Sequence, residues 1–303
     1  MTDAELRAAI EAALGRPARS VERRPGAYAS SFAVEELEVG ALDGSTVRLI
    51  LKDVSTAGLA PTAVCAKSPA LLDAAREPAV YRELLRPWEL DVPVCHASGP
   101  GWLLLEAVDG TPLWQCGAWD AWKAAARWLG DLHRRGAPPG PASLVRYDGR
   151  HLDGLLHAAL AAMPGGALDA VVLAWERAAK LLVTWPQALV HGDFYPSNVL
   201  VAPGTDGARI RPVDWELAGI GAGLLDLAAL TAGRWTAAER ERLAVAYRSA
   251  SSDQPPHFGE AFESARLAVA VGWLGRSAHW TPPPQHAQDW LAVARDAAGR
   301  LGR

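Results

Sequence analysis

Residues 189–201 read LVHGDFYPSNVLV, and this stretch carries the strongest signal in the chain. Its two ends are short apolar segments of the kind found in buried strands. Between them stand Asp193 and, five positions later, Asn198. An acidic and an amide side chain in a short loop can simply cap a turn. The segments that follow decide between that structural role and a chemical one.

A second acidic residue, Asp214, comes sixteen residues after Asn198, at the end of another apolar segment. The residues between them include PGTDG at 203–207, a turn-forming sequence that predicts a hairpin. A hairpin brings its two strand ends together. We therefore expect Asp193, Asn198 and Asp214 to meet at one place, which the turn-capping interpretation does not explain.

Three side chains with oxygen atoms suit Mg²⁺, which prefers carboxylates and phosphate oxygens as ligands. A carboxylate next to that ion can accept or align the proton of a hydroxyl group while phosphate is transferred to the hydroxyl oxygen. An aspartate followed five positions later by an asparagine, and then by a metal-binding aspartate, is the pattern of a kinase catalytic loop.

The composition of the 303-residue chain excludes several other classes of protein. Half of the residues are hydrophobic and 21% are charged, which excludes a largely disordered chain. The net charge of -4 disfavours a nucleic acid or a membrane surface as partner. No apolar run approaches the about 20 residues of a membrane helix, and the start of the chain does not resemble a signal peptide. Three cysteines without C-x-x-C spacing predict a reduced, cytoplasmic protein without structural zinc.

The order of predicted elements indicates an α+β fold, because strands dominate the first third of the chain and helices the rest. We expect strands at 32–37, 47–52, 92–97 and 102–107, and a strand-turn-strand block at 188–213. We expect helices at 3–14, 68–85, 119–135, 152–162, 168–185, 224–230, 236–250, 258–276 and 286–301.

The catalytic-loop pattern, together with VDWE at 213–216 and LDLA at 225–228, resembles the aminoglycoside phosphotransferase and choline kinase-like family of small-molecule kinases. Shorter segments in the same order support the resemblance, at 49–52, 76–81, 105–110 and 129–133. The resemblance covers roughly residues 25–230. It implies a protein-kinase-like fold of two lobes, with a small β-rich nucleotide-binding lobe over 1–107. A larger, mostly helical lobe over 108–303 would carry catalysis and bind the acceptor.

The resemblance also implies roles for single residues. Asp193 is the catalytic aspartate that faces the acceptor hydroxyl. Asn198 and Asp214 hold Mg²⁺. Lys52 contacts the α- and β-phosphates of the nucleotide, and Glu77 orients Lys52.

Further nucleotide contacts are implied by position. The Glu106 carbonyl and the Val108 amide would hold the adenine edge. Ser30 and Ser31 lie where the loop that covers the phosphates is expected. Glu216 follows the metal-binding aspartate, at a position where protein kinases have glycine, and we leave open whether it assists the metal or supports the structure.

Residues around the catalytic loop have structural interpretations. We expect His191 to brace the loop by hydrogen bonds rather than act as a general base. We expect Asp226 to cap the next helix and support the loop, and His133 to pack in the interior.

The predicted function is ATP- and Mg²⁺-dependent transfer of the γ-phosphate to a hydroxyl of a small molecule, for example an antibiotic, by a monomer or homodimer. GTP remains an alternative donor. Residues 199–303 carry 11 acidic and 11 basic side chains, which disfavours a polycationic aminoglycoside as acceptor. The alternatives are a kinase of a sugar, amino alcohol or nucleoside metabolite and, from another class, a nucleotide-binding pseudokinase scaffold. A protein kinase is disfavoured because no Ala-Pro-Glu marker follows Asp214.

Overall fold

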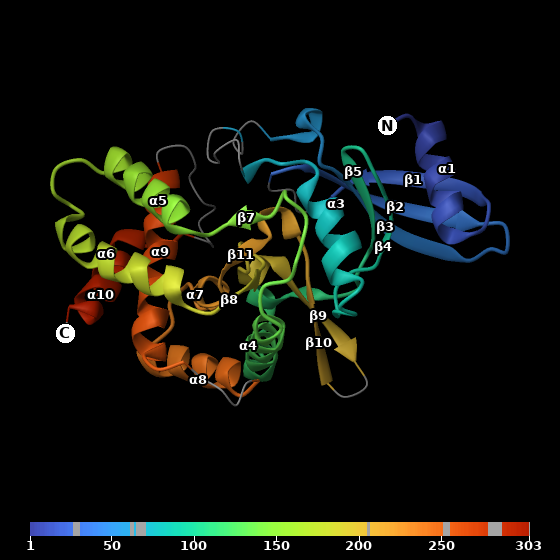
Figure 1. Ribbon diagram of the computed structural model, residues 1–303. Helices are drawn as coiled ribbons and strands as arrows, with labels where there is room; N and C mark the ends of the chain where they lie inside the picture. Colours follow the sequence, from blue (N-terminus) through green and yellow to red (C-terminus); the bar gives the residue numbers. More distant parts are fainter. Residues whose placement is uncertain are drawn as a thin grey trace.

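The computed structural model describes residues 1–26, 31–60, 64, 71–204, 207–250, 255–277 and 287–302. An antiparallel sheet of five strands, in the order β1-β2-β3-β5-β4, forms the N-terminal region (Figure 1). Its strands are β1 (Ala18–Pro25), β2 (Ala33–Ala41), β3 (Thr46–Asp53), β4 (Cys95–Gly99) and β5 (Trp102–Glu106). The strands β2 and β3 are joined by a tight turn, where Gly44 has a φ of 84°.

One helix covers each face of this sheet. Helix α1 (Asp3–Leu14) begins with a capping box between Thr2 and Glu5, and places Leu6 and Ile10 against β2, β3 and β5. Helix α3 (Arg76–Val80) continues through a wider helical turn, Tyr81–Leu85, on the other face. Because side chains alternate along a strand, Leu104 of β5 points to the α1 side and its neighbours Leu103 and Leu105 to the α3 side.

The C-terminal region is mostly helical, and the long helix α9 packs against four other helices there (Figure 1). Its helices are α4 (Trp119–Arg134), α5 (Gly149–Ala162), α6 (Asp169–Thr184), α7 (Leu224–Leu230), α8 (Ala237–Arg248), α9 (Phe258–Arg276) and α10 (Trp290–Leu301). Alanines of α9 such as Ala261, Ala265 and Ala268 are fully buried, and their small size allows the other helices to pack closely.

Two small sheets lie within the C-terminal region, with strand orders β10-β9-β6 and β7-β11-β8. Their strands are β6 (Thr111–Pro112), β7 (Val145–Arg146), β8 (Gln187–Val190), β9 (Val199–Gly204), β10 (Gly207–Pro212) and β11 (Gly219–Ala222). Short 3-10 turns occur at Thr56–Gly58, Leu113–Gln115, Pro196–Asn198 and Trp215–Leu217. The last two turns follow β8 and β10, so the small sheets position the loops that carry the motif residues.

The α+β fold, with a sheet region first and a helical region after it, is confirmed. The sequence missed β1, an edge strand in which most side chains are exposed and charged residues obscure the alternation. It also placed the start of α3 too early, because residues 72–75 are not helical, and the start of α10 four residues too early. The boundary between lobes at residue 107 stays a prediction.

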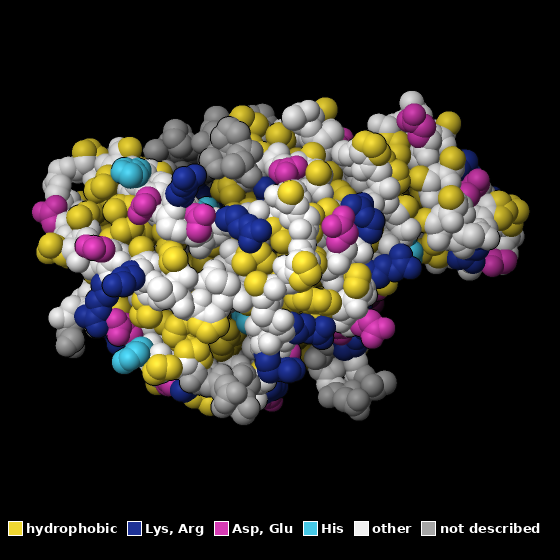
Figure 2. Space-filling model, in the orientation of Figure 1, with side chains coloured by type: hydrophobic (Ala, Val, Ile, Leu, Met, Phe, Trp, Pro, Cys, Tyr) yellow, Lys and Arg dark blue, Asp and Glu magenta, His cyan; other side chains and the backbone are white. Residues whose placement is uncertain are grey.

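On the face drawn in Figure 2, basic and acidic side chains are interspersed. Within the described part of the chain, no helix is both long and apolar enough to cross a membrane.

Candidate active site

The loop after β8 brings the first two motif residues into direct contact. The Asn198 side-chain amide donates hydrogen bonds to the Asp193 carbonyl and to Asp193 Oδ2, each 2.9 Å long. These two bonds fix the orientation of the Asp193 carboxylate. Because the amide nitrogen of Asn198 faces Asp193, its amide oxygen is the atom that can face a cation.

The hairpin of β9 and β10 has the predicted effect. Val199 at the start of β9 pairs with Pro212 at the end of β10, and the Val213 amide donates to the Asn198 carbonyl at 2.9 Å. The next residue, Asp214, therefore follows directly from the strand end that pairs beside Asn198. Asp214 has a φ of 66°, a conformation that residues other than glycine adopt rarely and that recurs at functional sites.

Helix α7 supports the loop that contains Asp193 and Asn198. Both oxygens of the Asp226 carboxylate accept backbone hydrogen bonds, from the His191 amide at 2.7 Å and from the Gly192 amide at 2.9 Å. His133 Nε2 of α4 lies 3.2 Å from the same carboxylate, and His133 Nδ1 lies 3.0 Å from the Tyr247 hydroxyl. The side chains of Asp226, His133 and Tyr247 are all buried. The predicted support of the loop by Asp226 and the interior packing of His133 are confirmed. The predicted capping role of Asp226 is wrong, because α7 begins at Leu224 without a side-chain cap and Asp226 lies within the helix, where its carboxylate is bound to the loop.

His191 braces the loop, as the sequence predicted. Its Nε2 donates to the Val213 carbonyl at 2.9 Å, and its Nδ1 accepts from the Asp193 amide at 3.3 Å. With both ring nitrogens used in this way, His191 is not placed to take a proton from a substrate.

Glycine at position 192 is required by the close packing of the loop. Gly192 has a φ of 81°, and a Cβ atom there would lie 2.1 Å from the Tyr147 hydroxyl and 2.3 Å from the Leu217 carbonyl. A residue with a larger side chain cannot occupy this position unless these neighbours move.

Lys52 joins the N-terminal sheet to the motif residues. Its Nζ lies 2.5 Å from Glu77 Oε2 and 2.6 Å from Asp214 Oδ1. The predicted pairing of Lys52 and Glu77 is therefore present, while the contact with Asp214 was not anticipated. Glu77 also accepts a hydrogen bond from the Trp215 amide at 3.1 Å, so this glutamate fixes both the lysine and the turn after Asp214.

The charges of this cluster shift the pKa values of its members. Burial opposes the charged form of Lys52, but the carboxylates of Asp214, Glu77 and Glu216 together raise its pKa well above the ordinary value. Burial raises the pKa of Glu77 to about 7, although Lys52 acts in the opposite direction. The cluster contains more carboxylates than ammonium groups, which favours the binding of a further cation.

Ser31 and Glu216 connect the predicted phosphate loop to the turn after Asp214. The Ser31 hydroxyl donates to Glu216 Oε1 at 2.6 Å, and the Glu216 carbonyl accepts from Arg76 at 2.7 Å. Glu216 is 4% exposed. These hydrogen bonds connect Glu216 to Ser31 and Arg76, and its relation to the metal stays untested. Ser30 lies outside the described residues.

The predicted adenine-binding segment follows β5. The Glu106 carboxylate accepts hydrogen bonds from the Val94 amide at 3.0 Å and from Arg211 at 2.6 Å, so it is occupied within the protein. The predicted contacts use the backbone of Glu106 and Val108, and these stay predictions. Sequence reasoning missed Arg211, because nothing in its neighbourhood marks a buried arginine that pairs over 105 positions with Glu106.

The residues present fit a Mg²⁺ ion that is shared with a nucleotide. Asp214 and Asn198 supply oxygen donors only, and Mg²⁺ usually takes one or two carboxylates and completes its shell with water and phosphate. Among the described residues, no group of three histidine, cysteine, aspartate or glutamate side chains could hold a metal by itself.

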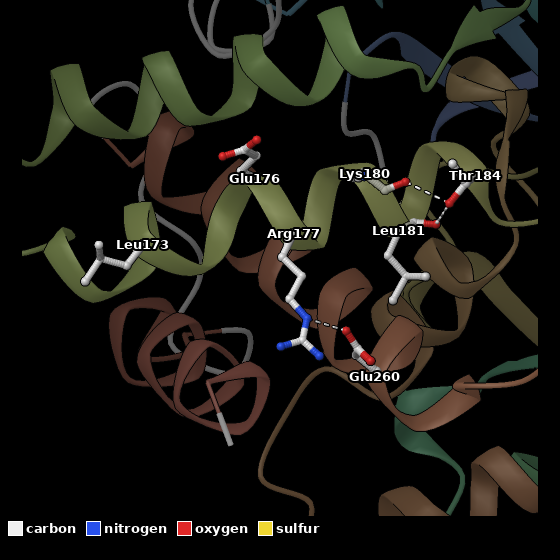
Figure 3. Close-up of a pocket in the computed structure, with 7 residues that line it drawn as sticks. All are labelled: Leu173, Glu176, Arg177, Lys180, Leu181, Thr184 and Glu260. Atoms are coloured by element: carbon white, nitrogen blue, oxygen red, sulfur yellow. Dashed lines mark hydrogen bonds and ion pairs between the residues drawn. The ribbon is translucent and has the colours of Figure 1, made fainter.

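An open groove of about 480 Å³ lies elsewhere, between α6 and α9 (Figure 3). It is lined by Leu173, Glu176, Arg177, Lys180, Leu181, Thr184 and Glu260. None of the predicted site residues lines it, and an ion pair of 2.6 Å between Arg177 and Glu260 crosses it. The groove is therefore separate from the motif residues.

Solved structures share this fold. A microcompartment-associated aminopropanol kinase is 16% identical, with a TM-score of 0.67 over 100% of this chain and 97% of that one. Choline kinase LicA from Streptococcus pneumoniae is 18% identical, with a TM-score of 0.62 over 98% of each chain. Macrolide 2'-phosphotransferase MphH from Brachybacterium faecium is 19% identical, with a TM-score of 0.58 over 99% and 98%.

Comparison of the sequence with models of protein families assigns the chain to a family. No curated protein matches the chain. The model of the phosphotransferase enzyme family matches residues 21–268, which include the catalytic loop, the turn at Asp214 and the Lys52–Glu77 pair. The chain therefore belongs to the phosphotransferase enzyme family.

Proposed function

We propose that the protein transfers the γ-phosphate of ATP, with Mg²⁺, to a hydroxyl group of a small molecule. The observation that carries this proposal is the joining of two sets of residues at Asp214. Asp214 contacts Lys52 on one side and follows the strand paired beside Asn198 on the other. A nucleotide site and an acceptor site would thus meet at Asp193 and Asp214.

Each residue has a role in this proposal. Lys52, held by Glu77, binds phosphate oxygens of the nucleotide. Asp193, oriented by Asn198, aligns the acceptor hydroxyl and takes its proton as the oxygen–phosphorus bond forms and the bond from the γ-phosphorus to the β–γ bridging oxygen breaks. Mg²⁺, held by Asn198 and Asp214, would neutralise phosphate charge. ADP and the phosphorylated acceptor leave, and the proton passes from Asp193 to solvent.

The acceptor class is the open part of this proposal. The named activities of the similar structures include amino alcohol and macrolide phosphorylation, so both a metabolite kinase and an antibiotic-modifying enzyme are consistent with the fold. A pseudokinase scaffold is disfavoured, because Lys52, Asp193, Asn198 and Asp214 are all present.

The test is phosphate transfer from ATP and GTP, with and without Mg²⁺, to a panel of sugars, amino alcohols, nucleosides, hydroxy acids and hydroxylated antibiotics. The Asp193→Asn variant should lose about 10²- to 10⁴-fold in turnover while it still binds nucleotide. Asp131→Asn is the matched control, because Asp131 is an exposed aspartate on α4 with a 3.6 Å ion pair to Arg134.

Near-normal turnover by Asp193→Asn would remove Asp193 from the catalytic role. Nucleotide binding without any phosphorylated product would instead favour the scaffold alternative. Failure of the wild-type protein to bind ATP would refute the proposal as a whole.

A further inference from the structure

The end of helix α9 lies beside the catalytic loop. Tyr195 is two residues after Asp193, and its hydroxyl accepts a hydrogen bond from the indole nitrogen of Trp273. The two rings meet edge to face with centroids 5.6 Å apart. Side chains near Trp273 on α9 are therefore close to the place where the acceptor hydroxyl would face Asp193.

Trp273 takes part in a stack that orients an arginine. The Trp290 ring of α10 lies parallel to it, at an interplanar angle of 7° and a centroid distance of 5.5 Å. The guanidinium carbon of Arg276 lies over the Trp273 ring, 5.1 Å from its centroid. A guanidinium held over an aromatic ring keeps its N–H groups available in the plane, where they match the oxygens of carboxylate and phosphate groups.

Arg276 differs from the neighbouring arginines in its partners. Arg266 on the same helix pairs with Glu263 and Asp296, and Arg177 pairs with Glu260. Among the residues that the structure describes, Arg276 makes no ion pair or hydrogen bond. The segment 278–286 that follows contains no aspartate or glutamate in its sequence. Within the described residues, no carboxylate is therefore paired with Arg276.

The positive charge of Arg276 acts on the surroundings of the catalytic loop. Burial raises the pKa of the Tyr195 hydroxyl, Asp193 raises it further, and Arg276 acts in the opposite direction. Burial lowers the pKa of His151, and Arg276 lowers it further. The Tyr195 hydroxyl is therefore close enough to both Asp193 and Arg276 for each charge to act on its pKa.

We propose that Arg276 binds an oxyanion of the acceptor, a carboxylate or a phosphate, so that the substrate is a hydroxylated acid rather than a cationic amino alcohol. The oxyanion lies on the guanidinium over Trp273, and the hydroxyl of the same molecule faces Asp193. This inference rests on the proposed phosphate transfer to a small molecule and specifies its substrate class. It assigns the acceptor a charge opposite to that of choline or an aminoglycoside.

The experiment uses two series of acceptors, and within each series one group is varied so that the molecule is anionic, neutral or cationic. The first is glycerol 3-phosphate, glycerate, glycerol and 3-amino-1,2-propanediol. The second is 4-(hydroxymethyl)benzyl phosphate, 4-(hydroxymethyl)benzoate, 4-(hydroxymethyl)benzamide and 4-(hydroxymethyl)benzylamine. Binding to the full-length protein loaded with Mg²⁺ and a non-hydrolysable ATP analogue is measured by calorimetry, and phosphate transfer is measured with ATP.

We expect an anionic member to bind about 10- to 100-fold more tightly than its neutral and cationic counterparts, the range of a charge-assisted hydrogen-bonded pair. The carboxylate and phosphate arms show which oxyanion is preferred. Arg276→Gln should abolish the preference, Arg276→Lys should retain part of it, and Arg276→Glu should favour the cationic member. Arg177→Gln, at the separate groove in Figure 3, is the matched control and should keep the preference.

Equal or tighter binding of the neutral or cationic members, or a preference that persists in Arg276→Gln, would overturn the inference. Binding of no anionic member at millimolar concentration would also overturn it. In all these cases the proposed function stands if ATP binds and phosphate is transferred to some acceptor. Loss of ATP binding by the wild-type protein would count against the proposed function instead.

Discussion

At the scale of single residues, the site depends on a surplus of carboxylates around one buried ammonium. Lys52 contacts Glu77 and Asp214 directly, and Glu216 adds to the negative field. Buried charges persist only where partners compensate for the loss of water. In this cluster one ammonium group faces several carboxylates, so it does not fully offset the burial of Glu77. Glu77 therefore holds its proton more strongly than an exposed glutamate does.

The protonation of Glu77 makes the stability of the nucleotide-free protein depend on pH. The pKa of Glu77 is raised from 4.5 to about 7 in the folded protein. Between these values the folded protein binds a proton that the unfolded chain does not bind. The free energy of unfolding should therefore fall as the pH rises from 4.5 to 7, by on the order of a few kcal/mol from this group.

Glu77→Gln should flatten that dependence, measured as the difference between variant and wild type in urea unfolding at several pH values. Glu83→Gln on the next helical turn is the control, because the Glu83 side chain is 41% exposed. Parallel pH profiles for the wild type and Glu77→Gln would show that Glu77 has an ordinary pKa.

At the scale of elements, the catalytic loop owes its geometry to a neighbour that carries none of the chemistry. Asp226 belongs to α7, yet it binds two successive amides of the loop and is 1% exposed. A carboxylate can accept both bonds at once because each of its oxygens is an acceptor. An asparagine has only one such oxygen and would direct N–H groups at the second amide.

Asp226→Asn should therefore lower the stability by about 1–3 kcal/mol, the cost of a buried amide left without its partner. It should also lower kcat while it leaves the KM for ATP nearly unchanged. The residues that the substitution displaces lie next to Asp193 and not next to Lys52. Thermal unfolding and steady-state kinetics measure the two effects, with Asp131→Asn as control. A stable variant with unchanged kcat would show that β8 alone positions the loop.

The elements that the sequence predicted well are those whose signals are local. The helices that begin at Asp3 and Ala237 have capping boxes at Thr2 and Thr236, which depend only on neighbouring residues, as does the hairpin at 203–207. Contacts between residues far apart in the chain have no such local pattern in the sequence. The contact of Lys52 with Asp214 joins residues 162 positions apart, and the bond of Ser31 to Glu216 joins residues 185 apart. Only the order of motifs, compared with a known family, indicated that these segments meet.

At the scale of the whole molecule, a few buried polar contacts connect the N-terminal sheet to the helical region. Arg211 of β10 reaches Glu106 at the end of β5, and Arg76 of α3 reaches the Glu216 carbonyl. The Ser31 hydroxyl binds the Glu216 carboxylate, and Ser31 is only 2% exposed. Nucleotide would bind between regions joined in this way, so these contacts should influence its affinity.

The Ser31–Glu216 bond can be tested by a double-mutant cycle of Ser31→Ala, Glu216→Gln and the combined variant. Because a hydroxyl donates to a buried carboxylate, we expect a coupling free energy of roughly 1–2 kcal/mol in chemical unfolding. Each single variant should also raise the KM for ATP several-fold, since Ser31 lies at the predicted phosphate loop. The bond does not couple the two regions if the losses in the free energy of unfolding of the two single variants add up to that of the combined variant and the KM for ATP is unchanged.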